Sequence, residues 1–209
     1  DQGRVWGDPH FVGADGGKYD VQGVAGNYYN ILSDDGLQVN ARFDEFAGPN
    51  SGQTVMGAIG ITLGTDTVEV SATEGVKING ETVEAGTYLD GKVTVLENGS
   101  VEINEQEYSF RIDAHENSAG DYLNIENIQS DNAAADGVLP SGLWGVTVDY
   151  DDDARNGDAG QGTQGGGAIE GLDGEITERG DTKTVGDYEV SGLFDVKFDH
   201  HNQFGSEED

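Results

Sequence analysis

Apolar and polar residues alternate along most of this chain with a period of two, which is typical of strands with one buried face. The clearest runs are residues 37–43, 59–63 and 108–112. Further strands are expected around Tyr19, Val21, Tyr29, Ile31, Val68, Val70, Val76, Ile78, Val93, Val95, Val101, Ile103, Leu123 and Ile125. Because no window of about 11 residues has a convincing helical period, we expect helices to be short or absent.

Turn signals separate these runs. Asn79-Gly80 and Asn98-Gly99 are strong hairpin signals because both residue types tolerate positive φ. Residues 44–53 carry glycines and a proline, which predicts a loop. Many short strands at intervals of about 8 to 12 residues predict an all-β sandwich or barrel with short antiparallel hairpins.

The pattern changes after Val148. Residues 149–158 form a strongly acidic run, and glycine, glutamine and threonine dominate up to residue 167, which predicts a long acidic loop with few groups to pack. Apolar residues return in 186–198, where we expect a last strand. We therefore predict a single domain over residues 1–198, followed by a polar tail or linker at 199–209.

The net charge restricts the kinds of partner that the chain can bind. The 209 residues include 41 acidic residues against 10 lysines and arginines, a formal net charge of −31. Repulsion among so many carboxylates favours bound cations or high ionic strength, and the negative charge makes nucleic acid a poor partner. The absence of cysteine excludes disulfide-linked assembly. No apolar run approaches the roughly 20 residues of a membrane span, and the start at Asp1 without a signal-like segment indicates a mature product or a piece of a larger protein.

Two motifs occur in a fixed order along the chain. The first joins a Gly-Asp-Pro-His-aromatic run to an Asp-Gly turn, and the second precedes the acidic loop. Their residues are Gly7, Asp8, Pro9, His10, Phe11, Asp15 and Gly16, then Gly142, Leu143, Trp144 and Gly145. This order resembles the von Willebrand factor type D (VWFD) domain, in a cysteine-free bacterial-type form. The resemblance implies a β-sandwich.

The acidic loop is a candidate calcium site. Carboxylates on a glycine-flanked segment are typical ligands for Ca²⁺, although Ala154 stands where an EF-hand needs glycine. The resemblance implies one calcium ion held by an acid of the first turn and by a subset of the loop, in a register left open because Val146 replaces the family's asparagine. The implied ligands are Asp15, Asp149, Asp151, Asp153, Asn156 and Asp158. The alternative is a solvated acidic loop without an ion.

The Asp8-Pro9-His10 triplet is a candidate for self-cleavage. The carboxyl group of Asp8 can attack its own peptide carbonyl, and the proline nitrogen is a comparatively basic leaving group. His10 could carry the proton. Some members of the resembled family cleave themselves at this bond in mild acid. In the alternative interpretation, Pro9 only directs the chain into the first strands and His10 has a structural role.

Trp144 and Ala25 stand where the resembled family has half-cystines, so a large aromatic against a small residue could fill the volume of a disulfide. The alternative is that the two tryptophans of the chain are buried independently. The sequence carries no phosphate-binding glycine loop, no Gly-x-Ser-x-Gly and no helical pair of metal-binding histidines, so it indicates no conventional enzyme.

Together these features predict a calcium-binding structural or adhesive module of a larger extracellular or cell-surface protein, with further copies of itself, other surface or matrix proteins, or glycans as partners. One competing hypothesis is a self-processing module acting at Asp8-Pro9. Another is a carbohydrate-binding module that stacks sugars on Tyr28, Tyr29 or Tyr150.

Overall fold

The structure, a computed structural model, describes residues 2–105, 107–131, 133, 136–148, 156–157, 169–173, 177 and 183–198. Strands dominate it, and the helices of the described residues are three short 3-10 turns, which confirms the prediction of an all-β chain with short helices. The predicted tail at 199–209 lies outside the described residues.

The elements are short and follow one another closely. They are β1 (Gly3–Trp6), β2 (His10–Val12), β3 (Lys18–Asp20), β4 (Tyr28–Asp34), β5 (Leu37–Phe46), β6 (Gln53–Leu63), β7 (Asp66–Ser71), β8 (Gly75–Ile78), β9 (Glu81–Val83), β10 (Gly86–Tyr88), η1 (Leu89–Gly91), β11 (Val93–Val95), β12 (Val101–Asn104), β13 (Ser109–His115), β14 (Tyr122–Gln129), η2 (Gly145–Thr147), β15 (Asn156–Gly157), η3 (Thr184–Tyr188) and β16 (Glu189–Val190).

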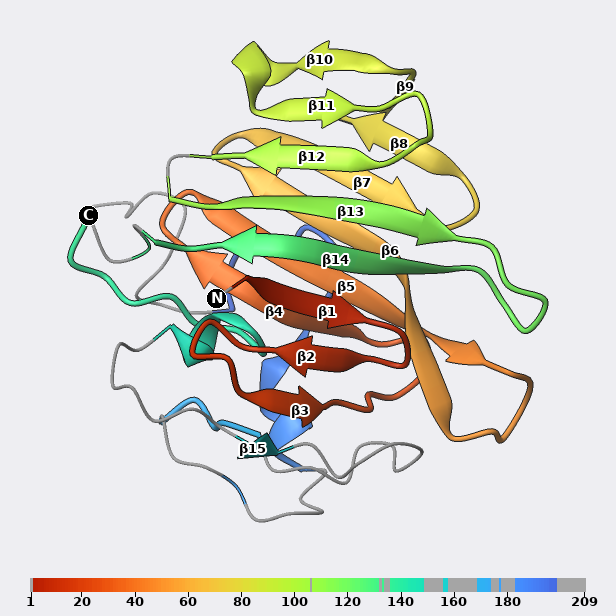
Figure 1. Ribbon diagram of the computed structural model, residues 1–209, viewed down its shortest axis with the longest axis vertical. Helices are drawn as coiled ribbons and strands as arrows, with labels where there is room; N and C mark the ends of the chain where they lie inside the picture. The colour runs from red at the N-terminus through yellow and green to blue at the C-terminus, as the bar shows by residue number, and fades with distance from the viewer. Residues whose placement is uncertain are drawn as a thin grey trace.

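The sixteen strands of the described residues all belong to one hydrogen-bonded sheet. One arm runs β10-β11-β12-β13-β14-β1-β2-β3-β15, and the other runs from β6 through β7, β8 and β9 on one side and β5, β4 and β16 on the other. The arms are joined where Leu123 of β14 pairs with Met56 of β6. Figure 1 shows the second arm passing behind the first. The sheet thus curls over itself, and a division into the two separate sheets of a sandwich is not confirmed.

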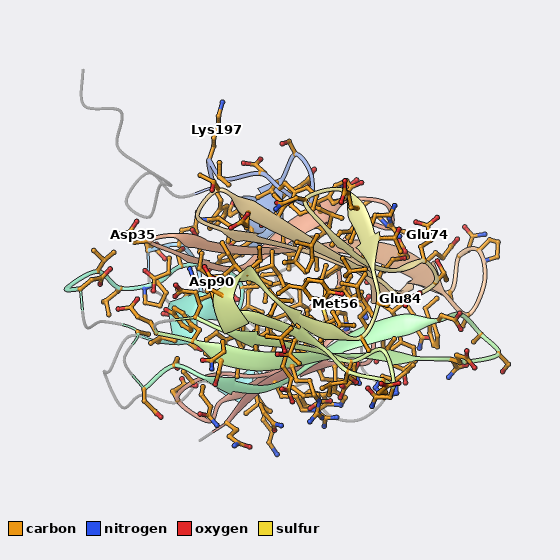
Figure 2. The ribbon with its side chains drawn as sticks, turned by 90° about the horizontal axis from the view of Figure 1, so that it is seen from above. Asp35, Met56, Glu74, Glu84, Asp90 and Lys197 are labelled. Atoms are coloured by element: carbon orange, nitrogen blue, oxygen red, sulfur yellow. The ribbon has the colours of Figure 1, made fainter. Side chains whose placement is uncertain are left out.

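The core fills the inside of this curl. Residues of alternating strand positions are buried there, as in β12, where Val101 and Ile103 are buried and the residues after them are exposed. In Figure 2 the side chain of Met56 lies in the interior, whereas Glu74 and Lys197 lie at the periphery. The predicted alternation therefore sorts the side chains correctly, because apolar burial is the main favourable term in folding.

The second face of β5 and β6 is also covered. Asn40 is fully buried on it, and its Nδ2 donates to the carbonyl oxygens of Leu193 at 3.1 Å and Asp195 at 2.9 Å. Gly60 lies so close to the backbone of Leu193 that a side chain there would collide with it. The segment after β16 therefore crosses these strands, and its carbonyl groups satisfy the buried amide of Asn40.

Trp144 belongs to no strand but contacts both β1 and β2. Its side chain is fully buried, its Nε1 donates to the carbonyl oxygen of Val12 at 2.8 Å, and its ring covers Gly3 so closely that a methyl group there would collide. Ala25 is exposed. The small residue beneath the ring is therefore Gly3, and the hypothesis that Trp144 packs against Ala25 in place of a disulfide is wrong.

Two predicted boundaries also differ from the structure. The last strand was expected over residues 186–198, but η3 and the two-residue β16 occupy its beginning, and bends and turns follow. The loop expected at 44–53 is shorter, because β5 continues to Phe46 and β6 begins at Gln53. In both places contact with the rest of the sheet, rather than local propensity, decides the backbone.

Candidate functional site

The Asp8–Pro9 bond lies in the turn between β1 and β2. Gly7 has φ +63°, a conformation that favours glycine, and its N–H donates to Oδ1 of the buried Asn124 at 3.0 Å. On the other side of the bond, the carbonyl oxygen of Pro9 accepts from the N–H of Val21 at 3.1 Å. The turn is therefore held on one side by Asn124 of β14 and on the other by Val21, the residue that follows β3.

His10 stands between two carboxylates. Its Nε2 lies 3.0 Å from Oδ1 of Asp8, and its Nδ1 contacts Oδ1 of Asp20 in a short hydrogen bond. His10 and Asp20 are direct partners in the β2–β3 ladder. The ring also lies 5.3 Å from that of Trp6, centroid to centroid. The imidazole is thereby aimed at the side chain that would attack the Asp8–Pro9 bond.

Asp20 was not predicted from the sequence. It is 2% exposed, although it is an acidic residue, and it lies next to the buried Tyr19 and Val21. A buried carboxylate is tolerated when it receives hydrogen bonds or faces a cation, and the ring nitrogen of His10 supplies that partner. The only available signal was an acidic residue inside an apolar strand, which does not reveal its cross-strand neighbour.

The predicted metal ligand Asp15 lies in the turn between β2 and β3. Its Oδ1 accepts from the N–H of Gly17 at 2.9 Å, and the N–H of Ala14 donates to Oγ1 of Thr147 at 2.9 Å. Thr147 belongs to η2, immediately before the acidic loop. The structure thus brings the Asp15 turn to the point where that loop begins.

The loop itself is described only in part. Asp149, Asp151, Asp153 and Asp158 lie outside the described residues. The backbone of Asn156 pairs in parallel with Lys18, three residues after Asp15. Segments on both sides of residues 149–155 therefore adjoin the β2–β3 hairpin.

A second acidic group was missed in the sequence. Carboxylate oxygens of Asp34, Glu107 and Asp136 lie within 4.8 Å of one another and could hold a metal ion. Asp34 ends β4 and is fully buried, with Oδ2 accepting from the hydroxyl of Tyr108 and Oδ1 from the N–H of Asp35 at 2.7 Å. These acids come from distant parts of the chain, so no local motif marks them.

Burial raises the pKa of two of these acids. The pKa of Asp34 rises from 3.8 to about 6, mainly through desolvation and despite the Tyr108 hydrogen bond. The pKa of Glu107 rises from 4.5 to about 7, through desolvation and then through the charges of Asp34 and Asp136. Three carboxylates so close cannot all be charged without cost unless a proton or a cation lies among them.

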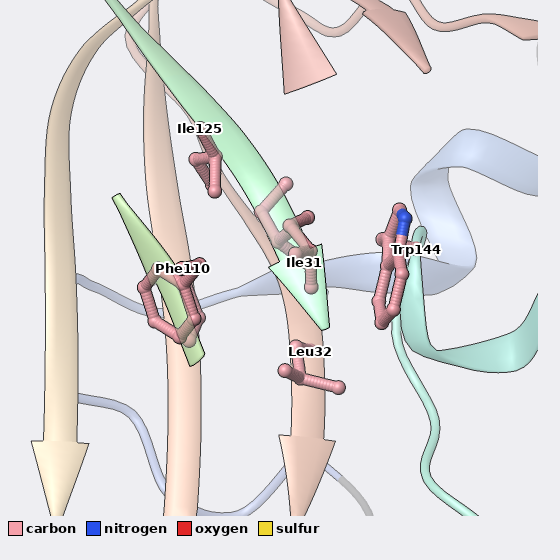
Figure 3. A pocket seen from close by; sticks show the side chains of 7 residues that line it. Ile31, Leu32, Phe110, Ile125 and Trp144 are labelled. Atoms are coloured by element: carbon pink, nitrogen blue, oxygen red, sulfur yellow. The ribbon is translucent and has the colours of Figure 1, made fainter. Parts of the chain in front are cut away.

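The apolar pocket inside the curl of the sheet is too small to hold an organic ligand. The apolar pocket in Figure 3, lined among others by Ile31, Phe110 and Trp144, has a volume of about 10 Å³, close to the minimum for one water molecule. Of the tyrosines considered for sugar stacking, Tyr29 is 1% exposed and packs on Phe43. A stacking role for Tyr29 is therefore wrong, and Tyr150 lies outside the described residues.

The fold and the turn define a class: an acidic, cysteine-free β domain whose Asp-Pro-His turn is held by the next hairpin. The sequence model of the von Willebrand factor type D domain family matches residues 3–124, more than half of the chain. The chain therefore belongs to this family. No curated protein matches the sequence. Domains of this family occur in extracellular proteins and mediate protein interactions within larger proteins. Within the described residues, no helix is long and apolar enough to cross a membrane.

The raised pKa values predict how stability depends on pH. The folded chain holds more protons on Asp34 and Glu107 than the unfolded chain between their ordinary and raised pKa values, so stability falls as pH rises from about 4 to about 7. Asp113 and Asp195 have lowered pKa values and titrate below this window. With chelator present, the melting temperature should therefore fall less between about pH 5 and pH 7.5 in Glu107→Gln than in the unmodified chain.

Thermal unfolding followed by circular dichroism measures this difference. The matched control is Glu81→Gln, because Glu81 is exposed on the edge strand β9. It should reproduce the fall of the unmodified chain. An equal fall of the melting temperature in Glu107→Gln would contradict a role for the three-acid group, which consists of Asp34, Glu107 and Asp136.

Proposed function

We propose that this chain is a calcium-stabilised structural or adhesive module of a larger extracellular protein. Family membership and the strongly acidic composition support the proposal. The observation that carries it is the contact between Ala14 and Thr147, which anchors the Asp15 turn beside the start of the acidic loop. A cation there would join parts of the chain more than 130 positions apart and relieve repulsion among carboxylates.

The oxygen atoms available as ligands at this place suit calcium. Asp15 offers a carboxylate, the nearby Thr147 offers a hydroxyl, and the loop sequence supplies further carboxylate and amide oxygens. Calcium takes 6 to 8 oxygen ligands in flexible geometry, whereas magnesium demands a strict octahedron and dehydrates reluctantly. Asp15 would hold the ion from the hairpin side, together with a subset of Asp149, Asp151, Asp153, Asn156 and Asp158.

Calcium should raise the melting temperature more than magnesium does. At about 100 times its dissociation constant, a ligand of the native state adds about 2.7 kcal/mol, which for a chain of this size is about 5 to 10 °C. Asp15→Ala should remove most of the increment that is specific to calcium. Differential scanning fluorimetry in calcium, magnesium and matched ionic strength measures it.

Two further variants make the assignment specific. Glu69→Ala removes an acid from β7, far along the chain from the turn, and should keep the full calcium increment. Loss of the increment in Asp136→Asn but not in Asp15→Ala would move the ion to the three-acid group. Equal shifts with calcium, magnesium and plain salt would mean that the loop is only a screened acidic surface.

We propose further copies of the module, or other surface or matrix proteins, as partners. Calcium should promote self-association, because neutralising carboxylates lowers the repulsion between surfaces of net charge −31. Light scattering at a few millimolar calcium, well above the affinity of weak extracellular sites, should report larger particles than in chelator. Association that is equally strong in chelator would contradict this mechanism.

A second function, self-cleavage at Asp8–Pro9, is favoured by the position of His10. With Nδ1–H donated to the buried Asp20, the ring directs Nε2 to the carboxyl group of Asp8. A protonated ring in this place can give its proton to the departing proline nitrogen, while Asp20 keeps the ring oriented and offsets its charge. Asp20 is thus a positioning residue in the proposed reaction.

Incubation near pH 5 should break the peptide bond after Asp8. Mass spectrometry under denaturing conditions should then detect an eight-residue fragment. In native size-exclusion chromatography the fragment should remain with the domain, because β1 pairs with both β14 and β2 and Val5 is fully buried. Asp8→Asn should abolish cleavage, since an amide is a poor nucleophile here. Asp20→Asn should slow it about 10-fold or more by loosening the ring.

The folded state of each variant is checked by its melting temperature in the same buffer. An unchanged mass of the unmodified chain after days near pH 5 would rule out self-processing. Cleavage at an equal rate in Asp20→Asn would leave self-processing intact and remove Asp20 from it.

A further inference from the structure

The carbonyl group of the Asp8–Pro9 bond has a dedicated hydrogen-bond donor. Nε2 of Gln22 lies 2.6 Å from the carbonyl oxygen of Asp8 and donates to it. This oxygen belongs to the peptide bond that self-cleavage would break. Gln22 follows β3 by two residues, so it leaves the same hairpin that brings Asp20 to His10.

The orientation of this amide is fixed by a third part of the chain. Oε1 of Gln22 accepts from both the N–H of Thr54, at 3.0 Å, and the hydroxyl of Thr54, at 2.8 Å. Both groups are donors to that oxygen, so a flipped amide would turn its NH₂ toward the backbone N–H of Thr54 and its oxygen toward the Asp8 carbonyl. Thr54 is itself buried, 4% exposed, at the start of β6. The NH₂ group therefore faces the Asp8 carbonyl.

We propose that Gln22 is a catalytic residue of self-cleavage, which donates the hydrogen bond that stabilises negative charge on the Asp8 carbonyl oxygen, and that Thr54 is its positioning residue. The proposal rests on the self-cleavage proposed above. A donor placed in advance on an oxygen that gains charge in the transition state lowers the barrier, because its hydrogen bond becomes stronger as the charge develops.

The reaction balances with groups of the chain and one water molecule. A carboxylate oxygen of Asp8 forms a bond to the Asp8 carbonyl carbon, whose oxygen becomes the oxyanion held by Gln22. The carbon–nitrogen bond to Pro9 then breaks as the proline nitrogen takes a proton from the imidazolium of His10. A cyclic anhydride remains at Asp8. Water opens it to two carboxyl groups, and a proton released on their ionisation restores His10.

This arrangement surrounds the bond with three separate functions. Asp8 supplies the nucleophile, His10 supplies the acid, and Gln22 supplies the oxyanion donor. A glutamine with a purely structural role would satisfy the Asp8 carbonyl group in the same way before the reaction, so the cleavage rate distinguishes the two roles.

The test compares first-order cleavage rates of the full chain near pH 5 by intact mass spectrometry. Gln22→Met keeps the length of the side chain without its donor, and the rate should fall about 100-fold, as is typical when one oxyanion donor is lost. Gln53→Met, at the neighbouring residue of β6, is the matched control and should keep the rate. The rate should fall by the same factor at every pH, because the acid that sets the pH profile is unchanged.

Thr54 provides an independent pair of variants. Thr54→Val removes the hydroxyl while keeping the N–H and the shape, so cleavage should slow several-fold, and Thr54→Ser should restore it. This pair carries the test if Gln22→Met does not fold, as judged by its melting temperature. Cleavage by Gln22→Met at the rate of the unmodified chain, or equal rates in Thr54→Val and Thr54→Ser, overturns the role of Gln22 while self-cleavage stands. An unmodified chain that never cleaves overturns both proposals.

Discussion

The register between β2 and β3 is the constraint on which the candidate site depends. It is set by apolar packing: Phe11 and Tyr19 are cross-strand partners, both are buried, and their rings stack with centroids 4.9 Å apart. The same register makes His10 and Asp20 partners one position away. A slip of one residue would turn Asp20 to the other face of the sheet and leave its carboxylate without the imidazole. A hydrophobic contact therefore positions a polar one.

The curl of the sheet supplies the rest of the site. Pairing of Leu123 with Met56 joins the two arms, and the residues close to this junction reach the same turn. Asn124 of β14 holds the N–H of Gly7, and Thr54 of β6 orients Gln22. The Asp8–Pro9 bond is thus fixed from both arms. Such positioning from rigid strands is what a reaction within one chain requires, because its efficiency depends on orientation.

Charge is the opposing constraint. Four cationic side chains of the described residues form pairs close to the surface, such as Arg111 with Asp113 at 2.8 Å, and pairs of this kind contribute little to stability. They cannot neutralise 41 acids. The fold therefore depends on its apolar core, while the carboxylates that come together, as in the group of Asp34 and Glu107, bind protons more tightly than usual. This explains why cations in solution are expected to matter for this domain.

The sequence by itself determined the strand composition and the Asn79-Gly80 hairpin, and it singled out Asp8, Pro9 and His10 as candidates for self-cleavage, because these follow from side-chain alternation, backbone preference and the reactivity of neighbouring residues. It could not reveal Asp20, Gln22 or Thr54, whose contacts with the Asp8–Pro9 turn and proposed roles arise from cross-strand register and from the closure of the curl. Nor could it foresee that Gly3 lies under Trp144 or that the segment after β16 buries Asn40. Local chemistry acts over a few residues and is visible along the chain, whereas contacts between residues tens of positions apart exist only after the strands pair, and only the tertiary structure decides which side chains then meet.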